Sequence, residues 1–496
     1  MAERNKAIWE KTIGELWQML ESGEVTSEEL VWAYGERIAS LDQAGPKLNA
    51  MQEINPDAMA LARLRDAQRK AGICLGPLHG IPLVLKDCID TADRMHTTCG
   101  AVMMKNHYAT EDAFLVERLR KAGAILLGKA HLSEWYGFCS SKAPSGYSGM
   151  AGGAMKNPYG VDRLKPGGSS GGCAVAVSAG YVPAAIGTET SGSIIEPAYF
   201  CSVVGWKPTV GLISRRGILP VVNCQDTPGT LTRSVADAAR LANVLVEKDE
   251  QDEGHWVAEA AEGTDFLAGL ETASLNGKRL AVARRGYWDT LTDGEKERME
   301  QALCLLRQGG AEVLDDIPDF LPGLILAGES QEAPVTGTVM EQGFLVRLND
   351  YLGHLGDDVP AHSLEALLKW NAAHPETIPY GQDYLEKIAS CKHPLLEKTF
   401  WEARKRDLDV CDRRGIGAAF QKYHLDAIVF PGVAGQGIAP RAGNPILTLP
   451  AGLDDTGKPV GLNLVGQKGQ DHALFLLGAA CERVLPRRVE PRLLSE

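Results

Sequence analysis

The chain has 496 residues, of which 44% are hydrophobic, so it is long enough to bury a sizeable core in one large domain or several small ones. A formal net charge of −13 argues against nucleic acid as a partner, because that binding normally depends on a basic surface. The 11 cysteines show no CxxC spacing, and we find no signal sequence and no apolar run of membrane-spanning length. We therefore expect a cytoplasmic protein with reduced thiols and no membrane partner.

Residues 10–70 are predicted to be helical. Thr26 is followed three residues later by Glu29, which is the pattern of a capping box at a helix start. Apolar residues then recur near the 3.6-residue period of a helix. Pro56 is expected to begin a third helix, because proline is well tolerated at the first helical position.

Residues 80–130 alternate between short apolar runs and an amphipathic stretch. The runs at 81–85 and 124–127 are typical of buried strands, and a helix is predicted between them at 113–122. This rhythm predicts an α/β sheet covered by helices. Lys86 directly follows the first run, where burial of a lysine is costly unless its amine is neutral or well hydrogen-bonded.

A long loop rich in glycine, serine and proline is predicted at residues 136–164. Loops of this length in a compact domain are usually functional or disordered. Because it precedes a glycine-rich block, we expect it to form a wall of a functional site. The segments ahead of it, 128–130 and 132–135, are expected to lead from a loop into a helix.

Residues 165–197 have a composition that the packing of a hydrophobic core does not explain. They contain two clusters of small residues, GGSSGG at 167–172 and TETSGS at 188–193. Glycine tolerates positive φ and lets backbone N–H groups approach a ligand closely. Such surroundings suit an exposed serine nucleophile with N–H groups directed at a developing oxyanion. Ser169 and Ser193 are therefore the candidate serines.

The rest of the chain continues the alternation of strands and helices. Acidic and polar residues at 248–275 predict a surface excursion, and residues 325–425 are predicted to be helices broken by prolines 360, 375, 379 and 394. Strands are predicted at 203–209, 279–283, 311–314, 427–430, 445–450 and 460–466, and helices at 234–247, 292–309 and 473–484.

Three blocks together resemble the amidase signature family of serine hydrolases: GPLHGIPLVLKDCID at 76–90, GGSSGG, and GTETSGSIIEPA, which ends at residue 198. Longer segments, among them NPYGVDRLKPGGSSGG, resemble the bacterial peptide amidase branch. The resemblance implies an α/β fold with a large, mixed, twisted β-sheet covered by helices on both faces. It implies a single domain over residues 1–496, with N-terminal helices (1–75), a catalytic core (76–247), a variable, partly helical region (248–425) and a C-terminal return to the sheet (426–496).

The same resemblance implies a Ser–Ser–Lys triad. Ser193 would be the nucleophile, Ser169 the bridging serine after a cis peptide bond that Gly168 makes easier, and Lys86 the base in its neutral form. Ser170 would be a supporting hydrogen-bond donor. No metal and no organic cofactor is implied. The oxyanion hole would consist of the backbone N–H groups of Thr190, Ser191, Gly192 and Ser193.

This triad implies hydrolysis of the C–N bond of a linear amide through an acyl-enzyme. Peptide C-terminal amides and aryl amides are the expected substrates, and a monomer or homodimer is the expected state. Carbamate or ester hydrolysis, and service as the amidase component of an amidotransferase that works with a partner chain, remain as alternatives. An inactive binding protein is disfavoured because all three catalytic positions are present.

The sequence departs from the family pattern at two places. Many members carry an arginine two residues after the nucleophile, where this chain has Ile195, and Glu196 follows it. The Glu196 carboxylate would either change the charge preference for substrates or be buried and paired. The segment 430–445 is short, which is expected to leave the pocket more open.

Other interpretations of the same residues exist. Lys86 could simply pair with Asp87. Residues 167–171 also fit G-x-S-x-G, the nucleophile elbow of α/β-hydrolases, with His424 and His472 as available histidines. A phosphate-binding loop and a metal site have less support, because no Gly-Lys-Ser/Thr sequence follows the glycines and no HExxH sequence is present.

Overall fold

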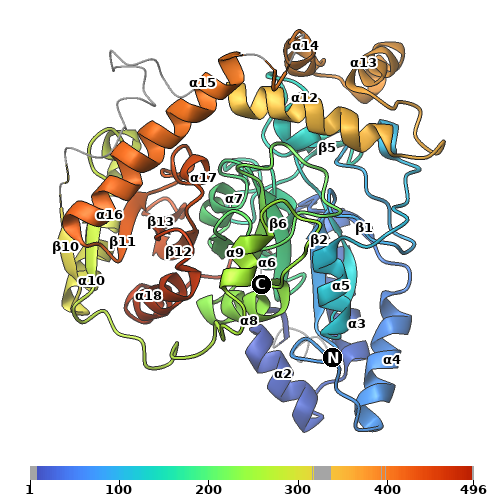
Figure 1. Cartoon of the computed structure of the whole chain (residues 1–496). Coiled ribbons are helices and arrows are strands. Elements are labelled where there is room, and N and C mark those ends of the chain that lie inside the picture. The colour runs from blue at the N-terminus through green and yellow to red at the C-terminus, as the bar shows by residue number, and fades with distance from the viewer. Residues whose placement is uncertain (1–7, 316, 318–336, 392–393, 397, 494–496) are drawn as a thin grey trace.

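The computed structural model describes residues 8–315, 317, 337–391, 394–396 and 398–493. Its strands form one mixed 11-stranded sheet and a separate small hairpin, as Figure 1 shows. The order in the large sheet is β1-β3-β2-β6-β8-β7-β12-β13-β11-β9-β10. The strands are β1 (Met51–Ile54), β2 (Pro82–Lys86), β3 (Ile125–Ala130), β6 (Ala184–Glu189), β7 (Val204–Lys207), β8 (Thr227–Thr232), β9 (Arg279–Val282), β10 (Glu312–Leu314), β11 (Ala427–Pro431), β12 (Ile446–Leu453) and β13 (Pro459–Val465), with β4 (Tyr147–Ser148) and β5 (Gly153–Ala154) as the hairpin.

Helices cover this sheet, and the predicted α/β fold is confirmed. The predicted capping box of Thr26 and Glu29 is present at the start of α3. The described helices are α2 (Ile13–Ser22), α3 (Ser27–Ile38), α4 (Ala58–Lys70), α5 (Phe114–Lys121), α6 (Gly171–Ser178), α7 (Ile195–Phe200), α8 (Val235–Leu245), α9 (His255–Ala260), α10 (Asp293–Gln308), α12 (Thr338–Gly353), α13 (Leu364–Ala373), α14 (Asp383–Ala389), α15 (Lys398–Asp407), α16 (Gly417–Tyr423), α17 (Ala439–Ala442) and α18 (Asp471–Val484). Within the described ranges, no helix is both long and apolar enough to cross a lipid bilayer.

Strand β2 lies between β3 and β6 and is parallel to both. All five of its residues are buried, which agrees with the apolar run that predicted it and includes Lys86 as its last residue. Strand β3 is longer than predicted, since residues 128–130 extend it instead of leading into a helix. Its extension pairs with β1, and the buried Lys129 amine within it donates to Ile89 O at 2.6 Å and Thr97 Oγ1 at 3.0 Å.

The helical prediction for residues 10–70 is wrong at β1. This strand, Met51–Ile54, is short, only partly buried and antiparallel to β3 at the edge of the sheet, so it lacks a strong apolar pattern. The following helix begins at Ala58 and not directly at Pro56. The predicted segment 132–135 leads only into a short 3-10 turn at Glu134–Gly137.

The block 165–197 contains more regular structure than its turns suggested. Helix α6 begins within the GGSSGG cluster, and strand β6 ends within the TETSGS cluster. The small residues permit close packing here: a Cβ added to Gly172 would lie 2.2 Å from His131 O and 2.5 Å from Ala50 O. Part of the small-residue pattern at 167–172 is therefore explained by the close packing of α6 against neighbouring backbone, and not by ligand binding.

The region between β10 and β11 is largely helical where it is described, as predicted, although residues 325–336 lie outside the described part. Figure 1 shows α12, α13 and α14 across one end of the molecule. The excursion at 248–275 is less superficial than expected, because it contains α9 and two buried carboxylates. Asp249 pairs with Arg216 at 3.0 Å, and Asp252 pairs with Arg215.

Candidate active site

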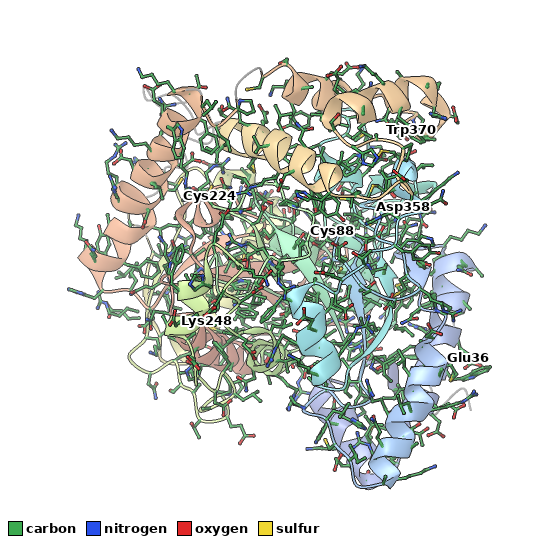
Figure 2. The ribbon with its side chains drawn as sticks, turned by 45° about the vertical axis from the view of Figure 1, so that its right-hand side comes forward. Glu36, Cys88, Cys224, Lys248, Asp358 and Trp370 are labelled. Atoms are coloured by element: carbon green, nitrogen blue, oxygen red, sulfur yellow. The ribbon has the colours of Figure 1, made fainter. Side chains whose placement is uncertain are left out.

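Lys86 lies fully buried at the end of β2, and its amine contacts two hydroxyl groups. Its Nζ is 2.8 Å from Ser169 Oγ and 2.9 Å from Thr188 Oγ1, and it donates to Thr188 O at 3.3 Å. The Lys86 amine lies over the ring of Tyr136, 5.0 Å from the ring centre. Cys88, which Figure 2 labels, contacts the same threonine, with its Sγ 3.8 Å from Thr188 Oγ1. Burial lowers the pKa of Lys86 below its usual 10.5, because the charged form loses its hydration.

The pairing of Lys86 with Asp87 is not observed. The Asp87 carboxylate instead accepts from the N–H of Thr98 at 3.1 Å and from the Thr98 hydroxyl. Successive side chains of a strand point to opposite faces of the sheet, so the two neighbours separate. Lys86 is left to interact with hydroxyl groups and a carbonyl.

Ser169 and Ser170 are positioned by the glycine-rich loop that precedes α6. The Gly168–Ser169 peptide bond is cis, as the resemblance implied. The Ser170 hydroxyl donates to Thr188 O at 3.0 Å and accepts from Thr188 N at 3.2 Å. Thr188 therefore joins the loop to Lys86, a role that the sequence did not reveal because Thr188 is one of several hydroxyl residues in its cluster.

Ser193 lies in the turn between β6 and α7. The buried carboxylate of Glu189 accepts from the backbone N–H groups of Ile194 at 2.7 Å and Ile195 at 3.0 Å, which caps the start of α7 directly after Ser193. Burial raises the pKa of Glu189. The Ser193 carbonyl accepts from the N–H of Ser170 at 3.1 Å, so the two serine segments are in direct contact.

Glycine is required at position 192 of this turn. Gly192 has φ +88°, and a Cβ on it would lie 1.9 Å from Gln436 Oε1. The neighbouring Ser191 hydroxyl donates to the Gln436 carbonyl at 2.8 Å. The short segment at 430–445 thus packs against the turn that contains Ser193.

Asp226 supports the same turn from another direction. Its Oδ1 accepts from Thr190 Oγ1 at 2.5 Å, and its Oδ2 accepts from the N–H groups of Val221 at 2.8 Å and Val222 at 2.7 Å. Burial raises the pKa of Asp226 to about 6. A single aspartate between two strands carries no distinctive sequence pattern, so the sequence alone does not identify Asp226.

We expect Asp226→Ala to lower kcat about ten- to a hundredfold, because a small displacement of catalytic groups is enough for such a loss. It also leaves two backbone N–H groups without their acceptor, at about 1–3 kcal/mol each. Asp226→Asn keeps one acceptor and should recover part of both losses. Steady-state kinetics and thermal unfolding of both variants measure this. A destabilised Asp226→Ala protein with an unchanged kcat would rule out a positioning role.

The two candidate serines open onto one cavity of about 260 Å³. As predicted, the loop at 136–164 forms a wall of it, and residues 378–381 complete that wall. The segment at 430–445 is not part of its lining. Residues 431–437 line a second cavity of about 570 Å³. The first cavity is lined by Ser133, Glu134, Tyr136, Gly137, Cys139, Ser140, Ala143, Pro144, Ser145, Tyr147, Gly168, Ser169, Ser191, Ser193, Glu196, Ile378, Tyr380 and Gly381.

Glu196 is both paired and accessible to the cavity. Its carboxylate is 3.0 Å from the Lys165 amine, with 20% of the Glu196 side chain and 54% of the Lys165 side chain exposed. The Lys165 amine also lies 4.7 Å from the centre of the Phe200 ring. Of the described residues that line the cavity, none is a histidine. His472 instead contacts Ala268 O at 2.9 Å, and His424 ends α16, so the α/β-hydrolase alternative has no support.

Comparison with known proteins decides the family. A family model described as "Amidase" matches residues 29–438. The chain belongs to the amidase family. This amidase is similar to the native peptide amidase of Stenotrophomonas maltophilia, with 36% identity over 98% of this chain and 99% of that one, and a TM-score of 0.89.

Two curated relatives extend the comparison. This amidase is 34% identical to a probable amidase from Arabidopsis thaliana, over 99% of this chain and 93% of the relative. It is 32% identical to one subunit of the glutamyl-tRNA(Gln) amidotransferase of Acidothermus cellulolyticus, over 98% of this chain and 96% of the relative. The resemblance that the sequence blocks indicated is confirmed, and the protein is a hydrolase acting on amides.

Proposed function

We propose that this amidase cleaves the C–N bond of linear amides with Ser193 as nucleophile, Ser169 as bridging serine and Lys86 as base. One observation supports this most strongly. A buried lysine with a lowered pKa contacts the hydroxyl of Ser169, 2.8 Å away, and Ser169 and Ser193 line the same cavity. An amine that is neutral at the reaction pH can accept a proton from that hydroxyl.

The proposed reaction has two halves. Ser193 Oγ bonds to the amide carbon while its proton passes to Ser169 Oγ and the Ser169 proton passes to Lys86. Backbone N–H groups of residues 190–193 stabilise the oxyanion. The C–N bond then breaks, and the relay returns a proton to the leaving nitrogen. Water attacks the acyl-enzyme by the same route, which releases the acid and restores the Ser193 hydroxyl.

Peptide C-terminal amides and aryl amides are the proposed substrates. The similarity to a peptide amidase over nearly the whole chain favours this class. Carbamates and esters are alternative substrates of the same triad. The similarity to an amidotransferase component favours, as a second candidate, a chain that releases ammonia to a partner chain.

Labelling with a serine-reactive fluorophosphonate tests the proposal. The purified chain should be labelled at Ser193, as located by peptide mass mapping, and Ser193→Ala should not be labelled. The same protein is assayed on peptide carboxamides, anilides, carbamates and esters. Label on Ser169 would overturn the assignment, and turnover that requires added partner chains would favour the amidotransferase alternative.

A further inference from the structure

The cavity at the candidate active site has an uneven distribution of charge. Among the described residues, its lining includes two carboxyl groups, those of Glu134 and Glu196, and no lysine, arginine or histidine. Glu134 is buried and accepts from the N–H of Gly149 at 2.8 Å, and burial raises its pKa to about 7. Glu134 is therefore only partly ionised near neutral pH, which leaves Glu196 as the principal charge of the cavity wall.

Glu196 is placed close to the reacting group. It lies three residues after Ser193, in the first turn of α7, and its N–H donates to Gly192 O at 2.8 Å. This bond fixes the backbone of Glu196 relative to the nucleophile turn. Glu196 therefore has a fixed backbone position in the wall of the cavity that Ser193 also lines, and its carboxylate is held by the Lys165 amine at 3.0 Å.

The partner of Glu196 can be displaced. Lys165 belongs to a loop, more than half of its side chain is exposed, and it is not part of the cavity lining. Ion pairs of this kind contribute little to stability, because water competes for both groups and the flexible lysine loses entropy. A cation that enters the cavity would therefore compete with Lys165 for the carboxylate at little cost in stability.

We propose that Glu196 binds a positively charged group of the substrate, so that the enzyme prefers amides with an ammonium or guanidinium group over neutral and anionic amides. This inference rests on the proposed function of the site, since the substrate must place its amide at Ser193. It names the substrate class as cationic amides, such as peptide amides with a basic residue near the scissile bond. It also predicts that a carboxylate on the substrate is unfavourable, because like charges repel in a confined cavity.

Three amides that differ only in their terminal group test the inference: δ-aminovaleramide (ammonium), hexanamide (methyl) and adipamic acid (carboxylate). We expect kcat/KM in the order ammonium, methyl, carboxylate, with about five- to tenfold between the first two. In Glu196→Gln the ammonium-to-methyl ratio should fall to about one. In Lys165→Met the ratio should rise, because the competing amine is gone.

Glu341→Gln is the matched control. Glu341 pairs with Lys387 at 2.6 Å with exposures of 19% and 63%, close to those of Glu196 and Lys165, but it lies outside the cavity lining. Glu341→Gln changes the net charge of the protein by the same amount as Glu196→Gln but leaves the cavity unchanged. The ammonium-to-methyl ratio of kcat/KM should therefore stay at the wild-type value. A ratio in Glu196→Gln equal to that of the wild type would overturn the inference.

Binding separates this inference from the proposed function. Calorimetric titration of the three amides into Ser193→Ala protein measures charge preference without turnover. A preference for the ammonium compound that is lost in Ser193→Ala/Glu196→Gln supports the role of Glu196 even if none of the amides is hydrolysed. Equal affinity for the ammonium and methyl compounds in Ser193→Ala would contradict it even if the hydrolysis mechanism is correct.

Discussion

Ser193→Ala is expected to lower kcat/KM for any amide substrate at least about ten-thousandfold, since removal of the nucleophile of a triad removes the covalent pathway. In the proposed relay Ser169, whose hydroxyl is 2.8 Å from the Lys86 amine, transfers the proton and does not replace the lost nucleophile. The fold should be unaffected, because the change removes one hydroxyl at the cavity surface. Steady-state kinetics and thermal unfolding on the same preparation measure both effects.

Ser145→Ala serves as the control for this loss. Ser145 lines the same cavity and loses the same atom, but it has no place in the proposed relay. Its effect should be much smaller than that of Ser193→Ala. Residual activity of Ser193→Ala within about tenfold of wild type would show that another group is the nucleophile.

Lys86→Met is expected to lower kcat about a thousandfold to ten-thousandfold, which is the upper range for loss of a general base and of the groups it orients. Methionine fills most of the buried space and lacks the amine, so Ser169 loses its proton acceptor. Lys129→Met is the matched control, because Lys129 is also buried and lies opposite Leu85 on the adjacent strand β3. Both variants lose stability, and only Lys86→Met should lose catalysis.

The pH dependence of kcat follows from the same lysine. Burial lowers the pKa of Lys86, so the amine becomes neutral at a lower pH than an exposed lysine would. In the proposed mechanism the neutral amine is the base, so kcat should rise with pH through this lowered pKa and then level off. This rise is tested by measuring kcat from about pH 5 to about pH 10 under conditions where the chemical step limits turnover. A flat profile would count against Lys86 as the base.

Local sequence signals were sufficient for part of this fold. The capping box at Thr26 and the apolar run of β2 depend on residues close in the chain, and both are found where the pattern predicted them. Strand β1 was missed because it lies at the sheet edge, where partial exposure weakens the apolar pattern. The end of β3 was missed because Lys129 looks unsuited to a buried strand until its hydrogen-bond partners are known.

Some residues of the candidate site can likewise be identified from the sequence, and others only from the structure. Lys86, Ser169 and Ser193 stand in distinctive blocks, so the sequence alone could nominate them. Thr188 and Glu189 are in the same blocks, but their roles appear only when β6 lies beside β2 and the turn enters α7.

Composition and patterns among residues close in the chain were enough to predict the α/β class and, through three short blocks, the resemblance to the amidase signature family. They also named the serines and the lysine that could carry out amide hydrolysis. Which groups meet was decided by folding: the Asp226 carboxylate and Thr190 are 36 positions apart in the chain, and the Gln436 carbonyl and Ser191 are 245 apart. Folding also decided that Glu196 is both paired with Lys165 and open to the cavity. This is because burial and hydrogen-bond partners are set by packing between distant segments, which no local pattern encodes.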